Sequence, residues 1–410
     1  MTRSAPSRCV DTALLLGLLA IQPAGADPID WRFQGYASQR LTASSGDNHF
    51  FGDTAGRFSA DYREVAAGLS WRPDPRWLLS GQAVHRQGGN SVEDDLETDY
   101  LFAAWSPLDV ADGSLTLRAG KIKVPYGLFN EGRDTPMTRP GILPPQSIYL
   151  DALRGFNQSA YGLHLGAAWD WDAATVSLSL SQIKPNLGGT NAFLSFVGDN
   201  VLFRGRLESN NQDAFAARLA YEHDGGRIKA MLSHASGHAR YVPGAGDLWS
   251  GGHLDPAFTT LSLQWNSERL SLSWERSRNL FRNHYDSLFL PALDVKSVGS
   301  SQYLQAEWRF NSRWTGFLRY DTLFMDDDDK DGTAFAAANP GRVAWERYAK
   351  DWTLGLRYRL DDHWQLAGEY HRVDGIGWLP PADNLSGGIW NPAATDRRWN
   401  LILFQATYQF

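Results

Sequence analysis

Residues 260–274 read TLSLQWNSERLSLSW, and this stretch decides the fold. In 260–265 and again in 269–274, Leu and Trp alternate with polar residues, so each segment has one apolar face that ends in a Trp ring. A period of two residues is typical of a β-strand with only one face in an apolar medium. Three residues, 266–268, join the two segments, which predicts an antiparallel hairpin.

Similar segments recur along the whole chain. We expect sixteen strands, at 29–41, 59–71, 76–87, 97–106, 114–123, 160–170, 174–183, 213–222, 227–236, 257–266, 269–278, 300–310, 313–323, 350–360, 363–373 and 397–410. Because 76–87 and 97–106 allow either face to point outward, totals of fourteen or eighteen are alternatives.

The connections between these strands are of two kinds that alternate. Tight ones are expected at 72–75, 107–113, 171–173, 223–226, 266–268, 311–312 and 361–362, with long ones rich in Gly, Pro, Asn and Asp between them. Short turns at one end and long loops at the other are typical of up-and-down β-barrels of the bacterial outer membrane, with both termini on the periplasmic side. A soluble β-sandwich or propeller has no reason for this alternation. The fold class is therefore all-β, an antiparallel transmembrane barrel.

Composition agrees with a barrel. The chain has 17 Trp, 15 Tyr and 20 Phe at a mean hydropathy of −0.39, and no apolar stretch after residue 26 is long enough for a spanning helix. A barrel can place its rings in two girdles at the lipid–water boundaries. The last strand fits this picture, since Ile402, Phe404, Ala406, Tyr408 and Phe410 share one face. We interpret Phe404, Tyr408 and the terminal Phe410 as a signal to the barrel-assembly machinery; the alternative is an ordinary amphipathic strand.

The first 26 residues are expected to be a cleavable signal peptide. Arg3 and Arg8 precede an apolar run at 13–21, and small residues follow at 24–26, which predicts cleavage between Ala26 and Asp27 and export through the periplasm to the outer membrane. The alternative is an uncleaved membrane anchor. The mature barrel would span 27–410.

Cleavage changes the charge and removes the only cysteine. The 39 basic and 46 acidic residues of the whole chain become 37 and 45, a net charge near −8, which argues against a nucleic-acid partner. Cys9 leaves with the signal peptide, so disulfides, thiolate metal sites and cysteine nucleophiles are excluded in the mature chain.

One segment carries a family resemblance. Residues 117–127, LRAGKIKVPYG, resemble the strand-to-loop entry of phosphate-selective-type and related porins, and the expected topology resembles that of sixteen-stranded bacterial porins over the whole mature chain. The resemblance implies a homotrimer that lets small hydrophilic solutes or ions diffuse passively, without a cofactor, in contact with outer-membrane lipid and lipopolysaccharide. It also implies that the third long connection, here 124–159, folds into the lumen and narrows it. Five prolines stiffen this segment; the alternative is a lid over the mouth.

Pore chemistry is set by fixed charges on the wall and at the constriction. In the constriction segment and at its entry we expect Lys121, Lys123, Glu131, Arg133, Asp134, Arg139 and Arg154. On the wall we expect Arg118, Arg218, Lys229, Arg269, Arg309, Arg319, Arg357 and Arg359, with Glu64, Glu222, Glu275, Glu307 and Glu369. The basic excess predicts a weak preference for anions. The alternative is structural ion pairing across strands, such as Glu307 beside Arg319.

Two further patterns have weaker support. The spacing of Asp327, Asp329 and Asp331 is that of the first half of a calcium loop, but the position of the closing Glu is Ala338, which favours a solvated loop. Ser233, His234, Ser236 and His238 are the nearest approach to a lipase or protease site, with no G-x-S-x-G motif in the chain. A barrel enzyme, or a structural or adhesive barrel without a conducting pore, is the alternative function.

Overall fold

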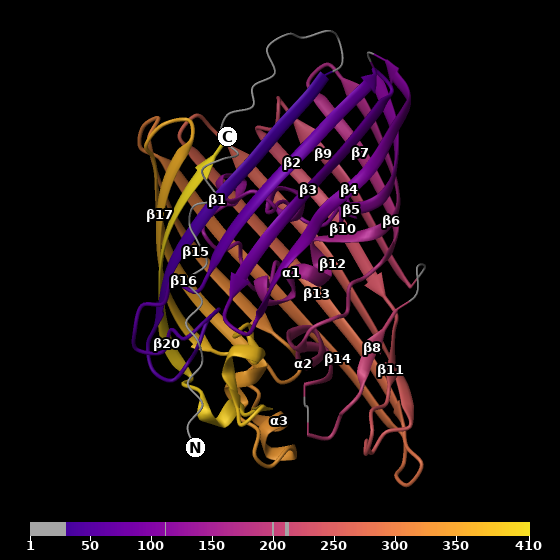
Figure 1. Ribbon diagram of the computed structural model, residues 1–410, viewed down its shortest axis with the longest axis vertical. Helices are drawn as coiled ribbons and strands as arrows, with labels where there is room; N and C mark the ends of the chain where they lie inside the picture. The colour runs from indigo at the N-terminus through magenta and orange to yellow at the C-terminus, as the bar shows by residue number, and fades with distance from the viewer. Residues whose placement is uncertain (1–29, 111, 199–200, 210–212) are drawn as a thin grey trace, which may run out of the picture.

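The computed structural model describes residues 30–110, 112–198, 201–209 and 213–410, and their backbone forms a closed antiparallel barrel (Figure 1). Each strand pairs with its neighbours along the chain, and the barrel closes where β1 pairs with β20. The sixteen barrel strands are β1 (Asp30–Ser44), β2 (Arg63–Asp74), β3 (Trp77–Gly88), β4 (Val92–Val110), β5 (Gly113–Lys123), β6 (Ser159–Trp171), β7 (Ala174–Lys184), β9 (Ala214–His223), β10 (Ile228–Gly237), β12 (Gly251–Asn266), β13 (Leu270–Asp286), β14 (Leu293–Arg309), β15 (Trp314–Phe324), β16 (Tyr348–Arg359), β17 (Trp364–Gly375) and β20 (Arg398–Gln409). The predicted fold class and strand number are confirmed.

Of the remaining elements, β8 (Arg206–Glu208), β11 (Ala239–Val242), α2 (Thr190–Val197) and α3 (Thr333–Ala338) lie toward the end with the long connections, at the bottom of Figure 1, whereas α1 (Arg154–Asn157) lies at mid-height within the barrel. Strands β8 and β11 pair with each other, and β11 also pairs with β12, so they extend the sheet at the long-connection end. β18 (Leu385–Ser386) and β19 (Ile389–Trp390) form a small hairpin. The 3₁₀ turns are η2 (Asn130–Gly132), η3 (Pro136–Thr138), η4 (Asp151–Leu153), η5 (Ala344–Arg347), η6 (Pro381–Asn384) and η7 (Pro392–Ala394). Among the described residues, none of these helices is long and apolar enough to cross a membrane.

The barrel wall has polar side chains on its inner face and apolar side chains on its outer face, the reverse of a soluble protein. On β20 the inward side chains of Leu403, Gln405 and Thr407 are buried, whereas the outward Phe404 is 51% exposed. On β13 the inward Ser, Glu and Asn side chains are buried, and outward Leu272 is 38% exposed. Polar groups inside and exposed apolar groups outside are the arrangement of a barrel surrounded by lipid.

The chain end contributes to closure. Phe410 exchanges backbone hydrogen bonds with Gly35, at 3.0 and 3.1 Å. A Cβ on Gly35 would lie 2.4 Å from Phe410 Cζ, so the terminal ring occupies the space that this glycine leaves. The face predicted for Phe404, Tyr408 and Phe410 is therefore observed, while their role in assembly stays a prediction. The cleavage site at Ala26 and Asp27 lies outside the described residues.

Several strand ends differ from the prediction. β12, β13 and β14 extend beyond the expected 257–266, 269–278 and 300–310 at their long-loop ends, and β4 covers 92–110 rather than 97–106. The connection between β3 and β4 is consequently only 89–91, although a long one was expected, and the tight turn expected at 107–113 shrinks to 111–112. At these strand ends polar residues lie on both faces, so the sequence shows no alternation of apolar and polar residues from which the strand could be predicted.

Candidate functional site

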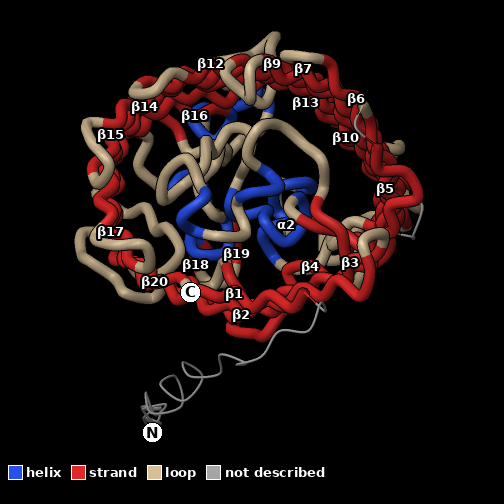
Figure 2. The backbone as a smooth tube through the Cα atoms, turned by 90° about the horizontal axis from the view of Figure 1, so that it is seen from above, coloured by secondary structure: helices blue, strands red, loops and turns tan. Residues whose placement is uncertain are grey.

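Loops and short helices fill the ring of strands (Figure 2), and segment 124–158, between β5 and β6, contacts strands on different sides of the wall. It leaves the wall at Pro125, where Tyr126 donates or accepts hydrogen bonds with Thr260 on β12 (2.6 Å) and Ser277 on β13 (3.2 Å). Gly127 has a φ of +57°, and a Cβ there would lie 2.1 Å from the hydroxyl of Tyr149. Glycine at this point therefore lets the segment turn across the barrel against its own returning limb.

The first anchor of this segment is Glu275 on β13, whose side chain is fully buried. Its carboxylate accepts hydrogen bonds from the backbone N–H of Leu128 (2.9 Å) and the hydroxyl of Tyr149 (2.6 Å). Two wall residues, Ser262 (2.5 Å) and Tyr303 (2.8 Å), donate to the same carboxylate. One buried acid thus joins both limbs of the segment to the barrel wall, with its lone pairs well satisfied.

The second anchor lies on β15 to β17. Glu369 accepts hydrogen bonds from the backbone N–H groups of Ile142 (2.5 Å) and Leu143 (3.2 Å). The guanidinium of Arg319 donates to the carbonyl of Leu143 at 3.1 Å. Behind Glu369, the buried ring of His371 lies between that carboxylate (3.2 Å) and Asp351 (2.7 Å). The tip of the segment is therefore held by paired donors and acceptors of the wall.

The third anchor is an arginine cluster, which we define as Arg86, Arg139 and Arg154 around the buried carboxylate of Glu64. Arg139 and Arg154 belong to the crossing segment and lie 2.8 and 2.5 Å from Glu64 on β2. Arg86 on β3 lies 3.2 Å from Glu64 and also pairs with Asp99 on β4. Arg86 also lies 3.4 Å from Glu97, so three guanidinium groups share three carboxylates, and the Nη2 atom of Arg154 has no hydrogen-bond partner among the described residues.

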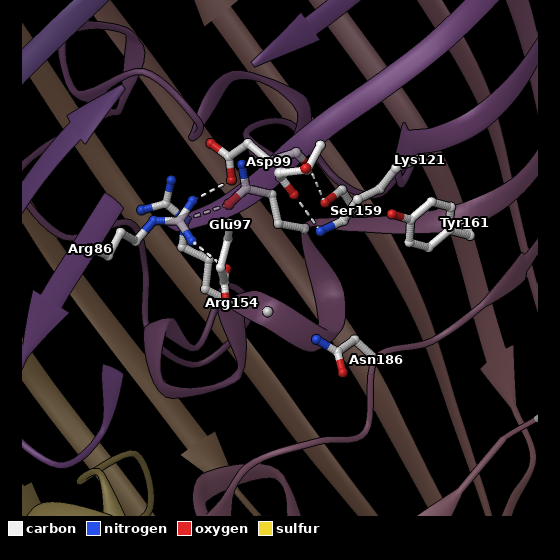
Figure 3. A pocket seen from close by; sticks show the side chains of 11 residues that line it. Arg86, Glu97, Asp99, Lys121, Arg154, Ser159, Tyr161 and Asn186 are labelled. Carbon is white, nitrogen blue, oxygen red and sulfur yellow. Dashed lines mark hydrogen bonds and ion pairs between the residues drawn. The ribbon is translucent and has the colours of Figure 1, made fainter. Parts of the chain in front are cut away.

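A cavity of about 180 Å³ lies beside this cluster, where β4 and β5 separate (Figure 3). The β4–β5 ladder ends at the pair Leu101–Lys121, beyond which β4 continues alone on that side. Figure 3 shows Arg86 at one side of the cavity and Lys121 and Tyr161 at the other. The wall therefore has a charged recess at this height.

Several predicted wall and segment residues that keep some exposure inside the barrel lie on the side of β5, β9 and β10, although Glu307 and Arg357 on β14 and β16 are partly exposed too. Arg218 on β9 pairs with Glu131, and Lys123 lies 2.6 Å from Asp134. Lys229 pairs with Glu222 at 3.3 Å, with both side chains partly exposed. Arg118 on β5 is half-buried, stacks at 5.6 Å over the ring of Phe102 and has no acidic partner among the described residues. This wall, formed by β5, β9 and β10, carries a basic excess.

Other predicted residues are structural. The guanidinium of Arg133 is buried and donates to the carbonyl of Tyr149 at 2.8 Å. Arg357 pairs with Glu307 and donates to the carbonyl of Arg139 at 3.1 Å. Arg309 donates to the carbonyl of Glu268 at 2.9 Å. These basic groups hold segment 124–158 and the turn before β13 in place, so their hydrogen-bond donors are already used within the protein.

Three placements on the wall were wrong. Lys121 pairs in register with the outward, exposed Leu101 and Tyr161, and its ammonium donates to the carbonyl of Thr98 at 2.5 Å. It continues the outward face of Leu117 and Ala119. Arg269 lies exposed in the turn before β13, and Arg359 is exposed at the last position of β16.

The suggested pair of Glu307 with Arg319 is also wrong. Glu307 is opposite Phe317 in the β14–β15 register, and Arg319 is opposite Gln305, to which it donates at 3.3 Å. One-dimensional spacing placed both on the inner face but could not give the register between strands. Sequence reasoning also missed Arg86 as a site residue, because both faces of 76–87 mix polar and apolar side chains.

The acidic loop provides no metal centre in the structure. The carboxylate of Asp329 accepts hydrogen bonds from the backbone at the start of α3, Asp331 accepts from Thr333, and Asp327 accepts from Ser300. Within the described ranges, no three His, Cys, Asp or Glu side chains are grouped to hold a metal ion. The calcium interpretation is not supported.

The enzyme candidates are likewise separated. Ser233 points inward, where it accepts a hydrogen bond from the backbone of Gly127 at 3.0 Å. His234, the next residue of β10, is on the opposite face and bonds to Thr259. His238 bonds to Asp255 at 2.6 Å. Adjacent residues of a strand point to opposite faces, so Ser233 and His234 cannot act on one substrate together.

Solved structures share this fold. The chain superposes on the outer membrane channel DcaP of Acinetobacter baumannii with a TM-score of 0.57 and 12% identity, covering 93% of this chain and 97% of that one. It superposes on the anion-selective porin from Comamonas acidovorans with a TM-score of 0.56 and 13% identity, covering 93% of this chain and 100% of that one. It superposes on the trimer form of OmpT, an outer membrane protein of Vibrio cholerae, with a TM-score of 0.52 and 10% identity, covering 94% of this chain and 100% of that one. No family model and no curated protein matches the sequence.

Proposed function

We propose that the chain is a porin of the bacterial outer membrane, through which small hydrophilic solutes and ions diffuse passively. The observation that carries this proposal is segment 124–158, which crosses the lumen and is held by buried carboxylates on opposite walls. A crossing segment fixed at Glu64, Glu275 and Glu369 keeps the remaining opening at a constant size, as a size limit on diffusing solutes requires. The fold shared with DcaP and the anion-selective porin supports the same function.

We further propose a weak preference for anions, determined on the wall formed by β5, β9 and β10. Among the half-exposed charges there, Arg118 has no acidic partner within the described residues, while the other basic groups are paired. An unpaired cation beside the path lowers the energy of a passing anion and raises that of a cation. The neighbouring arginine cluster adds to the positive electrostatic potential along the path. The name of the Comamonas protein, an anion-selective porin, is consistent with this preference.

The test is electrical. Purified protein inserted into planar bilayers should give ohmic conductance steps, and a salt gradient should give a reversal potential of the sign that reports anion preference. An Arg118→Gln variant should keep the conductance steps and lose most of the preference. Absence of conductance from folded, inserted protein would refute the porin, whereas clear cation preference would refute only the selectivity.

We propose that the porin is a homotrimer that contacts neighbouring copies through the outer face of β1 to β5. The outward positions there include small residues, namely Ala37, Ala67, Ala83, Ala103 and Ala119. Exposed apolar side chains of the same strands, among them Phe33, Leu69 and Leu101, lie on the same face. A row of small side chains within an apolar face suits close approach of a second copy, which would also cover the charged recess at Lys121. OmpT in its trimer form supports this assembly state. Cross-linking in the membrane should give three-subunit products, and only single subunits would refute the proposal.

The remaining steps are proposals about export. We propose that signal peptidase removes residues 1–26 and that the barrel-assembly machinery recognises the last strand. The outward, exposed rings of Phe404 and Phe410 support the second step. The mature protein would then lie among outer-membrane lipid and lipopolysaccharide.

A further inference from the structure

The outward face of β13 carries an arginine stripe, which we define as Arg276 and Arg278. Both side chains are exposed. They follow Leu270, Leu272 and Trp274 on the same face, so the stripe begins one position beyond the aromatic ring that ends the apolar run. Aromatic side chains of such barrels lie at the boundary between hydrocarbon and headgroups. The stripe therefore lies beyond this ring, toward the long-loop end of β13.

The strands on either side of β13 do not neutralise the stripe. Arg276 is opposite Leu261 on β12 and Gln302 on β14, and Arg278 is opposite Thr259 and Ser300. All four cross-strand neighbours are uncharged. Ser300, opposite Arg278, donates a hydrogen bond to Asp327, whose carboxylate also lies 3.8 Å from Lys330. Neither arginine forms an ion pair or hydrogen bond with another described side chain.

Some exposed arginines at this end share an acid, whereas Arg282, which follows the stripe on the same face of β13, and Arg372 on β17 form no ion pair within the described residues. Arg206 and Arg240 both bind Glu208, at 2.7 Å each. A chain with a net charge of −7 has ample acid to pair two more arginines. Like charges on one strand face repel each other, so two adjacent arginines without a counter-ion in the protein indicate an external anion.

The spacing suits one phosphate group. Residues i and i+2 lie about 6–7 Å apart on the same face of a strand. Long guanidinium side chains at that separation can converge on a single phosphate with charge-assisted, bidentate hydrogen bonds. We therefore propose that Arg276 and Arg278 bind the phosphate of a phosphorylated glycolipid in the outer leaflet. The adjacent apolar run formed by Leu272, Trp274 and Leu261 would contact its acyl chains. The site depends on the barrel being in an outer membrane, as proposed above, but not on conduction.

Lipid binding to detergent-purified protein, measured by native mass spectrometry, tests this proposal with bisphosphorylated lipid A as the probe. The Arg276→Gln/Arg278→Gln variant should bind this lipid roughly tenfold or more weakly, because it loses both charge-assisted contacts. The matched control Arg206→Gln/Arg240→Gln removes the same charge at paired, exposed positions and should bind like the wild type. An Arg276→Lys/Arg278→Lys variant keeps the charge without the bidentate geometry and should fall between the two.

Two further arms identify the source of the phosphate. Dephosphorylated lipid A should bind the wild type as weakly as bisphosphorylated lipid A binds the Gln variant, and millimolar inorganic phosphate should not displace the lipid. Equal binding of wild type and Gln variant, equal binding of dephosphorylated lipid, or displacement by inorganic phosphate would each overturn the proposal. Because both positions are exposed, the Gln variant should fold and conduct normally. A loss of conductance in every protein, with lipid binding intact, would refute only the pore.

Discussion

Replacing Glu64 by Gln should release one end of the crossing segment. The Glu64 carboxylate is fully buried and is the acidic partner of Arg139 and Arg154, at 2.8 and 2.5 Å. Removing one partner of a buried ion pair costs about 3–5 kcal/mol, because the other charge remains buried without compensation. Both arginines share the same carboxylate, so the costs are not additive. The equilibrium between docked and released segment should therefore shift by roughly two to almost four powers of ten.

Single-channel recording measures this shift directly. The Glu64→Gln channel should show larger open-state noise and transitions between sub-levels, and its anion preference should increase, since three guanidinium groups lose a shared counter-charge. The matched control is Glu222→Gln, which breaks the half-exposed pair with Lys229 at 3.3 Å. A pair of that exposure contributes about 0–1 kcal/mol, so the control should keep the open-state noise of the wild type, while the Lys229 that it leaves unpaired should also raise the anion preference. If the Glu64→Gln and Glu222→Gln channels have the same open-state noise as the wild type, the anchoring role of Glu64 is refuted.

Three other substitutions test separate parts of the molecule. Arg118→Glu should lower the anion-to-cation permeability ratio severalfold at low salt, because one unit charge at 4 Å in water changes an ion's energy by about 1 kcal/mol; an unchanged reversal potential would contradict the assigned path. Glu275→Ala should lower the free energy of unfolding by roughly 3 kcal/mol or more, because several buried donors lose their acceptor. Glu275→Gln should lower it less. Equal denaturation curves for both variants and the wild type would contradict the anchoring role of Glu275. Phe410→Ala should slow barrel assembly into vesicles, measured by the change in gel migration on folding, while Phe215→Ala, another outward ring, should not. Equal rates for these two variants would leave the terminal ring without a special role.

The fold could be predicted because its code is local. Alternation in stretches such as 260–265 and 269–274 reports one strand at a time, and lipid outside and polar groups inside keep the signal strong over the middle of every strand. The alternation is lost where a strand extends beyond the lipid. Residues 279–286 of β13 were not predicted as strand, because the aromatic Phe281 and Tyr285 face inward into a hydrophobic cluster while Arg282 and His284 face outward, so the alternation of 269–278 does not continue.

The candidate site could be predicted only in part. The composition of 124–159 indicated a stiff, charged segment, and the pleat placed Glu64, Glu275 and Glu369 on the inner face. Which groups meet depends on strand register and on where the segment crosses, so Glu307 was matched with Arg319 rather than with Arg357. Lys121 was misplaced because it was assigned to the lumen from its position at the loop entry, although the strand pleat puts it on the outward face of Leu117 and Ala119.

By itself the sequence determined a barrel with one apolar and one polar face, since period-two hydropathy is a property of consecutive residues. Only the tertiary structure decided that three buried carboxylates from distant strands hold the crossing segment, and that Arg276 and Arg278 have no acidic neighbour. The physical reason is that ion pairs and hydrogen bonds act over a few ångströms. Closure of the barrel brings Glu64 and Arg154, 90 positions apart, to 2.5 Å, and separation along the chain does not encode that distance.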